Sequence, residues 1–145
     1  MDDPIAVAYL ARATSYTLVS LPNQTANQLA SGLTAVPGLG QYITGFAARS
    51  VTTKAGDPVA LALVLSLDPS YAALPGVYDG LVKGIAGPNR VAQQETLAGR
   101  PAAYFDDLGG IAGLTWLQRR FVVILYGKNR TSMEQLGTAL ISANQ

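Results

Sequence analysis

Seven short segments of the chain are rich in residues that favour strands, and glycine or proline separates most of these segments. In several of them hydrophobic residues alternate with small or polar ones. A repeat of two is typical of β-strands, because successive side chains of a strand point to opposite faces of the sheet. The pattern predicts strands over residues 15–21, 46–54, 59–67, 90–97, 101–106, 114–118 and 121–126. The last two are either paired across a tight turn near Arg119 or continuous.

Helical spacing of hydrophobic residues predicts three helices, each next to a residue that favours a helix start. Asn23 is placed to cap a helix over residues 23–36. The pair Asp68-Pro69 predicts a short helical turn and then a helix that ends after Ile85. The run Thr131-Ser132-Met133-Glu134 has the form of a capping box, so we expect it to start the last helix.

These elements predict an α+β fold. Strands joined by hairpins run antiparallel, so we expect one antiparallel β-sheet of six to seven strands with three helices packed mainly on one face. No linker or low-complexity tract divides the chain, and residues 1–145 are expected to form a single domain. The side chains expected in its core are Leu29, Leu33, Leu61, Leu63, Leu65, Leu81, Val123, Leu136 and Leu140.

The strand predicted over residues 59–67 has two different faces. The bulky side chains at every second position are expected in the core, whereas Ala60, Ala62, Val64 and Ser66 point the other way. A face of small side chains permits the close approach of another surface. The strand predicted from residue 121 is apolar on both faces and needs cover on both sides.

Charged residues are sparse, at 13% of the chain against about 25% in a typical soluble domain. We therefore expect a protein partner, or a second copy of this chain, to cover part of the surface. Ten basic residues balance nine acidic ones, which indicates no basic face and excludes nucleic acid as a partner. The adjacent pair Arg119-Arg120 is interpreted as a solvated turn rather than a phosphate clamp.

The chain contains no histidine and no cysteine. It therefore lacks the usual general base near neutral pH, the commonest metal ligand and a thiol nucleophile. We predict no catalytic residues, no metal site and no cofactor. The alternative is an enzyme that uses the carboxylates of Asp106, Asp107 and Glu95. Adjacent strand residues point to opposite faces, so Asp106 and Asp107 are not expected to converge.

Three stretches resemble extracytoplasmic α+β domains of actinobacterial envelope proteins. They are Phe46-Ala47-Ala48-Arg49 with its hairpin, Leu97-Ala98-Gly99-Arg100-Pro101, and Trp116 followed by residues 121–127 and a final helix. The order of hairpins and closing helix is also similar to that of PsbP-like lipoproteins, although the early tryptophan-containing strand typical of that family is missing. The resemblance implies an extracytoplasmic location, in the cell envelope or secreted, and a non-enzymatic role.

No run approaches the roughly 20 apolar residues that cross a bilayer, so no transmembrane segment is predicted. The acidic start Met1-Asp2-Asp3-Pro4 has no signal-peptide pattern. For an exported protein, we expect the leader to have been removed.

The function predicted from these observations is that of a non-enzymatic interaction or assembly module, which self-associates or docks on another envelope protein. Aromatic side chains anchor many interfaces, so the predicted interaction surface consists of Val64, Tyr104, Trp116 and Tyr126, with the three aromatic residues on one sheet face. The alternative is a domain that binds an apolar small molecule or lipid between the sheet and the helices.

Overall fold

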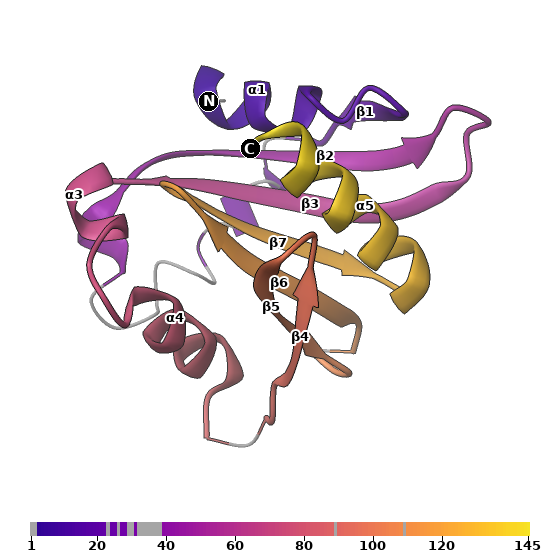
Figure 1. Cartoon of the computed structure of the whole chain (residues 1–145). Helices are drawn as coiled ribbons and strands as arrows, with labels where there is room; N and C mark the ends of the chain where they lie inside the picture. The colour runs from indigo at the N-terminus through magenta and orange to yellow at the C-terminus, as the bar shows by residue number, and fades with distance from the viewer. Residues whose placement is uncertain are drawn as a thin grey trace.

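The computed structural model describes residues 3–22, 24–25, 27–28, 31, 39–88, 90–108 and 110–145. It confirms the predicted fold class, since one antiparallel sheet of seven strands carries four α-helices in this part of the chain (Figure 1). The strands are β1 (Tyr16–Ser20), β2 (Ile43–Thr53), β3 (Pro58–Leu67), β4 (Gln93–Leu97), β5 (Arg100–Phe105), β6 (Ala112–Gln118) and β7 (Phe121–Gly127). The helices are α1 (Pro4–Ala11), α3 (Pro69–Ala72), α4 (Val77–Ala86) and α5 (Arg130–Ala143), with a 3-10 turn, η1, at Gly40–Tyr42.

The sheet consists of two meanders that meet in its middle. The strand order is β1-β2-β3-β7-β6-β5-β4, and every neighbouring pair is antiparallel. At the centre, Leu63 of β3 pairs with Ile124 of β7. The chain between β3 and β4 forms α3 and α4 on its way to the far edge of the sheet. β6 and β7 are thus two strands joined by a tight hairpin, one of the two predicted arrangements.

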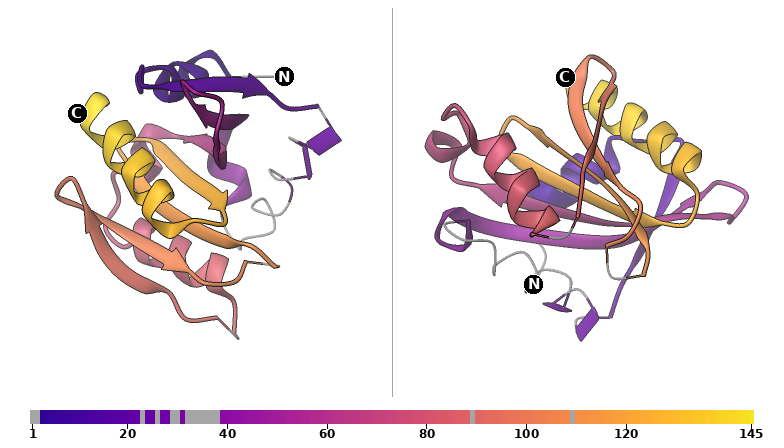
Figure 2. Two further views of the ribbon diagram at one scale, coloured as in Figure 1. Left: turned by 90° about the vertical axis from the view of Figure 1, so that its right-hand side faces the viewer. Right: turned by 90° about the horizontal axis from the view of Figure 1, so that it is seen from below.

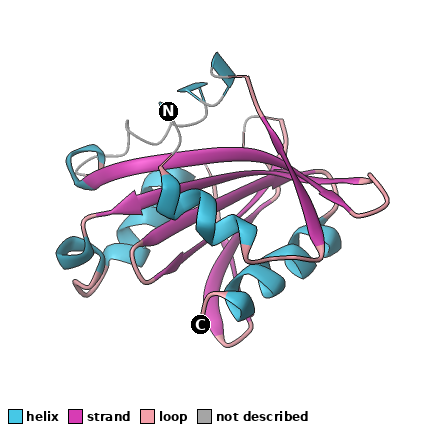
Figure 3. Cartoon of the chain, turned by 90° about the horizontal axis from the view of Figure 1, so that it is seen from above, coloured by secondary structure: helices cyan, strands magenta, loops and turns pink. Residues whose placement is uncertain are grey.

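Helices cover both faces of the sheet, which corrects the prediction that they lie mainly on one. The small side chains of β3, among them Ala62 and Val64, are buried and pack with residues of α1 and α5. Figure 3 shows helices lying over the strands on this side of the sheet. On the opposite face, Leu63 and Leu65 pack with residues of α3 and α4, so that α4 and α5 lie on opposite sides of the strands (Figure 2). Apolar residues on both faces of β3 and β7 are therefore covered within the chain.

Most of the predicted core is confirmed. Leu63, Leu65, Leu81, Val123, Leu136 and Leu140 are each at most 3% exposed. Leu61 is only half-buried, because it lies near the end of β3 that leads into the β2–β3 hairpin. The helix predicted over residues 23–36, with Leu29 and Leu33, lies largely outside the described residues, and those two leucines fall wholly outside them.

Two helix starts differ from the sequence prediction. α1 was not predicted, although it begins with Asp3 as its cap and Pro4 at its first position, and the Asp3 carboxylate accepts a hydrogen bond from the Ile5 amide. α5 begins at Arg130 rather than after Thr131, because the Asn129 side chain accepts from the Ser132 amide at 2.9 Å. No helix in the described ranges combines the length and apolar character that crossing a membrane requires.

A buried chain of hydrogen bonds joins α1, β6 and α5 around Tyr9. The Trp116 indole donates to the Tyr9 hydroxyl at 2.9 Å, and that hydroxyl donates to Gln118 Oε1 at 2.5 Å. Gln118 in turn donates to the backbone oxygen of Ile141 at 3.1 Å, while the Asn144 side chain donates to the backbone oxygen of Tyr9 at 3.0 Å. The buried side chains of Tyr9, Trp116, Gln118 and Asn144 thus all have partners, and these bonds fix both helices on one face of the sheet.

We expect Tyr9 to make the domain sensitive to alkaline pH. Burial raises the pKa of the Tyr9 hydroxyl from 10.0 to about 12. The fold favours the neutral phenol, so this stabilisation is fully present below pH 10 and is lost as the pH rises through 10 to about 12. Urea unfolding across this range should show that the stability difference between the wild type and Tyr9→Phe changes by about 2–3 kcal/mol. A difference that is constant with pH would contradict the assignment.

Candidate functional site

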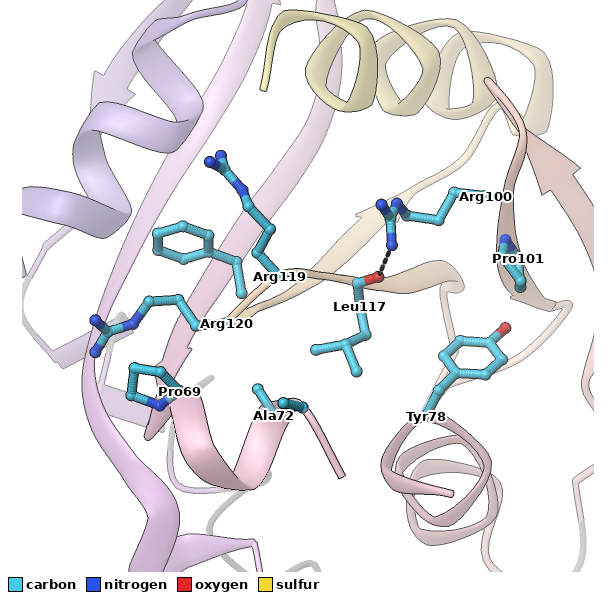
Figure 4. A pocket seen from close by; sticks show the side chains of 10 residues that line it. Pro69, Ala72, Tyr78, Arg100, Pro101, Leu117, Arg119 and Arg120 are labelled. Carbon is cyan, nitrogen blue, oxygen red and sulfur yellow. Dashed lines mark hydrogen bonds between the residues drawn. The ribbon is translucent and has the colours of Figure 1, made fainter. Parts of the chain in front are cut away.

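An open groove lies where the β6–β7 hairpin faces α3, the start of α4 and the start of β5 (Figure 4). Its volume is about 560 Å³, within the usual range of small-molecule pockets of about 300–1,000 Å³. Most of the lining side chains are aliphatic, proline or aromatic. The lining residues are Pro69, Ala72, Ala73, Tyr78, Arg100, Pro101, Leu117, Arg119, Arg120 and Phe121.

Hydrogen bonds and ring stacking hold α3 in place as one wall of the groove. The Asp68 carboxylate caps this helix, accepting from the Ser70 amide at 2.8 Å and from the Tyr71 amide at 3.3 Å. The Tyr71 ring stacks on Tyr42, with centroids 3.8 Å apart and planes 5° apart. These contacts fix the small side chains of Ala72 and Ala73 toward the groove, where they leave its volume open.

Tyr78 of α4 forms the far end of the groove. Its hydroxyl donates to Gln94 Oε1 of the edge strand β4 at 3.2 Å. Burial raises the pKa of this hydroxyl from 10.0 to about 12, so it is neutral at physiological pH. Tyr78 therefore presents an apolar ring and a polar tip, but no charge, to this end of the groove.

The β6–β7 hairpin brings two arginines to the other end. Its two-residue turn is Arg119-Arg120, and Arg119 has a φ of +55°, in the left-handed region that glycine favours. The Arg120 backbone oxygen accepts from the Leu67 amide at 2.8 Å, which anchors the turn to β3. A non-glycine residue held in this region costs about 1 kcal/mol or more.

Three guanidinium groups border the groove, and they retain free hydrogen-bond donors. Arg100 donates from one terminal nitrogen to the Leu117 oxygen at 3.1 Å, and Arg120 donates to the Thr44 hydroxyl at 3.2 Å. The buried Nε atoms of Arg100 and Arg120 have no hydrogen-bond partner. Within the described residues, no carboxylate lines the groove or forms an ion pair with Arg100, Arg119 or Arg120.

The structure does not assemble the predicted interaction surface. Val64 and Trp116 are completely buried, and Tyr104 is 7% exposed, because α1 and α5 cover this face. Tyr126 is half-buried and packs on the opposite face. The three aromatic side chains therefore do not share one sheet face, which corrects that expectation. The Arg130 guanidinium also covers the Tyr104 ring, at 4.0 Å from its centroid.

The three carboxylates of the alternative site have separate partners. Glu95 pairs with Arg130 at 2.7 Å, and Arg130 also pairs with Glu134 at 3.3 Å. Burial raises the pKa of the Glu95 carboxyl despite the opposing effect of Arg130. Asp106 accepts from the Gln93 side chain at 2.9 Å. Asp107 accepts from the Gly110 amide at 2.5 Å, and the described residues include no group of three side chains suited to hold a metal ion.

The groove residues were not singled out from the sequence as a site. The adjacent arginines Arg119 and Arg120 were the one available signal, and they were interpreted as a solvated turn. The groove depends on the contact of this turn with α3, which lies about fifty residues earlier in the chain and whose position the local pattern does not reveal. In comparisons with known proteins, the chain matches no protein-family model and no curated protein.

Proposed function

We propose that this domain is a non-enzymatic binding protein that holds an apolar small molecule or lipid chain in the groove beside the β6–β7 hairpin. The observation that carries the proposal is the open apolar groove itself. Apolar surface of this kind is normally covered in a folded monomer, and concave apolar pockets with a few polar groups are the usual form of ligand sites.

The walls of the groove are held in fixed positions, which distinguishes it from an ordinary packing defect. The elements that form it are fixed by a helix cap, a tyrosine stack and a backbone hydrogen bond, so it does not need to form around the ligand. A preformed site binds more tightly than a flexible one, because less conformational entropy is lost on binding. Leu117, half-buried on β6, supplies a floor that an apolar chain would cover.

The interaction-module hypothesis stays a prediction, with less support than before. It rested on the small-residue face of β3 and on strands that are apolar on both sides. α1, α5, α3 and α4 cover these surfaces within one chain. A solution mass above the 15.1 kDa of one chain would support self-association. The extracytoplasmic location is likewise a prediction, which rests on the resemblance alone.

Filling the groove should abolish ligand binding. We expect the wild-type domain to bind the neutral apolar dye Nile red with micromolar affinity, measured by its fluorescence. Ala73→Trp places an indole into the groove from an exposed position, so we expect the affinity to fall about tenfold or more while the fold is retained.

The matched control is Ala55→Trp, which adds the same indole at an exposed position in the β2–β3 turn. It should bind the dye as the wild type does. Equal loss in both variants, or no saturable binding by the wild-type domain, would refute the proposal.

A further inference from the structure

We infer that the ligand of this groove is an amphiphile with a carboxylate head, and that Arg100 and Arg119 bind that head while the apolar chain lies over Leu117. This inference rests on the proposed function, and it adds the chemical class of the ligand and the two residues that select it.

Two of the three guanidinium groups lie on the same side of the groove. Figure 4 shows the guanidinium groups of Arg100 and Arg119 on the side of the groove nearer to α5, whereas that of Arg120 lies on the opposite side, beside Pro69. Arg100 and Arg119 also act together on the Tyr9 hydroxyl, whose pKa both lower against the larger effect of burial. Two positive charges thus lie together on one side of the groove, apart from the third, Arg120.

Both of these arginines have hydrogen-bond donors that no group of the described residues occupies. Arg100 uses one terminal nitrogen for the Leu117 oxygen, and its buried Nε has no partner. No hydrogen bond or ion pair joins Arg119 to any described residue. A guanidinium presents a planar fork of donors that matches the two oxygens of a carboxylate, and such charge-assisted bonds are about twice as strong as neutral ones.

The backbone of the β6–β7 turn is strained at Arg119. Arg119 occupies a position with φ +55°, where glycine would be less strained. Strained backbone conformations cluster at ligand-binding sites, where the side chain has a function that offsets the strain. A charged side chain at this position projects beside the apolar floor, where a glycine would provide no group to bind an anion.

The shape of the groove favours a single chain behind the head. From the two arginines, the lining continues over Leu117 and Pro101 to Ala72 and the Tyr78 ring, with no carboxylate among the described lining residues. An amphiphile satisfies both parts of this surface at once. A purely apolar ligand would provide no acceptor for the second terminal nitrogen of Arg100 or for the Arg119 guanidinium, and a small anion would leave the apolar floor uncovered.

Calorimetric titration with decanoate and with decanol separates the contribution of the head group to the binding affinity from that of the chain. Both ligands are used below the concentration at which they aggregate. At pH 7 decanoate is ionised and decanol is neutral, with the same chain length. We expect the wild-type domain to bind decanoate about tenfold more tightly than decanol. In the variants Arg100→Gln and Arg119→Gln, the ratio of the affinity for decanoate to the affinity for decanol should fall toward one.

The control variant is Arg90→Gln, which removes the same charge beside the Asp106–Asp107 loop, and its ratio should equal that of the wild type. Arg119 is exposed, so its replacement tests the inference even if Arg100→Gln is unstable. Equal affinities for the two ligands, or a ratio that Arg119→Gln leaves unchanged, would overturn the inference but not the proposed function. No binding of either ligand would overturn both. Binding to vesicles that contain anionic phospholipid, without binding of decanoate, would overturn the inference in favour of a membrane surface.

Discussion

Val64→Asp is expected to unfold the domain. Val64 lies at the centre of β3, is completely buried, and packs among side chains of α1 and α5. An aspartate there would bury a carboxylate with no basic partner, which costs several kcal/mol, or would force the helices off the sheet. Since domains are stable by about 5–15 kcal/mol, we expect most of the population to be unfolded. Circular dichroism and urea titration would measure this loss.

Val91→Asp is the control, because Val91 is 86% exposed and its replacement should change the free energy of unfolding by about 0.5 kcal/mol or less. A folded Val64→Asp domain would show that α1 and α5 do not cover β3 in solution. The result also bears on the interaction hypothesis. A charge at Val64 would abolish any assembly simply by unfolding the chain, so this substitution cannot test self-association.

Trp116→Ala is expected to lower the free energy of unfolding by about 3–5 kcal/mol. Trp116 is completely buried, and its ring packs so closely on α5 that a Cβ at Gly137 would lie 3.2 Å from the ring atom Cζ3. The substitution leaves a cavity that the sheet and α5 cannot close without a backbone shift. It also removes the donor to the Tyr9 hydroxyl. Urea unfolding followed by circular dichroism provides the measurement.

Trp116→Phe separates the two contributions, because it keeps an aromatic ring but loses the indole N–H. We expect it to cost less than half as much as Trp116→Ala. If Trp116 were an interface anchor, as the sequence suggested, Trp116→Ala would weaken association and leave the stability of the isolated chain nearly unchanged. The buried hydrogen bond to Tyr9 favours the structural role.

The strands were predictable from the sequence because their alternation is local. Each predicted strand overlaps an observed one, and the differences at the ends are a few residues. The two faces of β3 were also read correctly as bulky and small. The helices that cover these two faces were not predicted correctly. Which helix packs on which face depends on connections between distant parts of the chain, and the local pattern does not reveal them. β3 and β7 pair across the whole segment that contains α3, α4 and β4–β6.

α1 was missed because its sequence has no helical alternation of polar and apolar residues. Its residues are apolar almost throughout, so no polar face alternates with a buried one, and Ile5 is exposed although it is hydrophobic. The Asp3-Pro4 start was visible, and it is the same signal that correctly placed α3 at Asp68-Pro69. For α5, the capping box was one of two possible caps, and the structure uses Asn129 instead.

The groove could not be derived from the sequence for a different reason. Its lining comes from five separate helices and strands, and two of its three arginines come from a turn that was interpreted as solvated. Only the approach of the β6–β7 hairpin to α3 makes Leu117 and Arg119 part of one surface with Pro69 and Ala72. The carboxylates Asp106, Asp107 and Glu95 illustrate the converse case, since they are near one another in sequence but bind separate partners.

The central pairing of β3 with β7 also sets the order in which a nascent chain can complete this domain. When β1, β2 and β3 have left the ribosome, they can already form a meander with α1 on one face. The free edge of β3 still lacks β7, however, and its two faces still lack α5 on one side and α3 and α4 on the other. β7 follows β3 only after residues 68–120, so this edge stays open while that whole segment is synthesised. Open apolar edges pair readily with other chains. This protein is therefore most exposed to aggregation in the interval after β3 and before β7 has been synthesised.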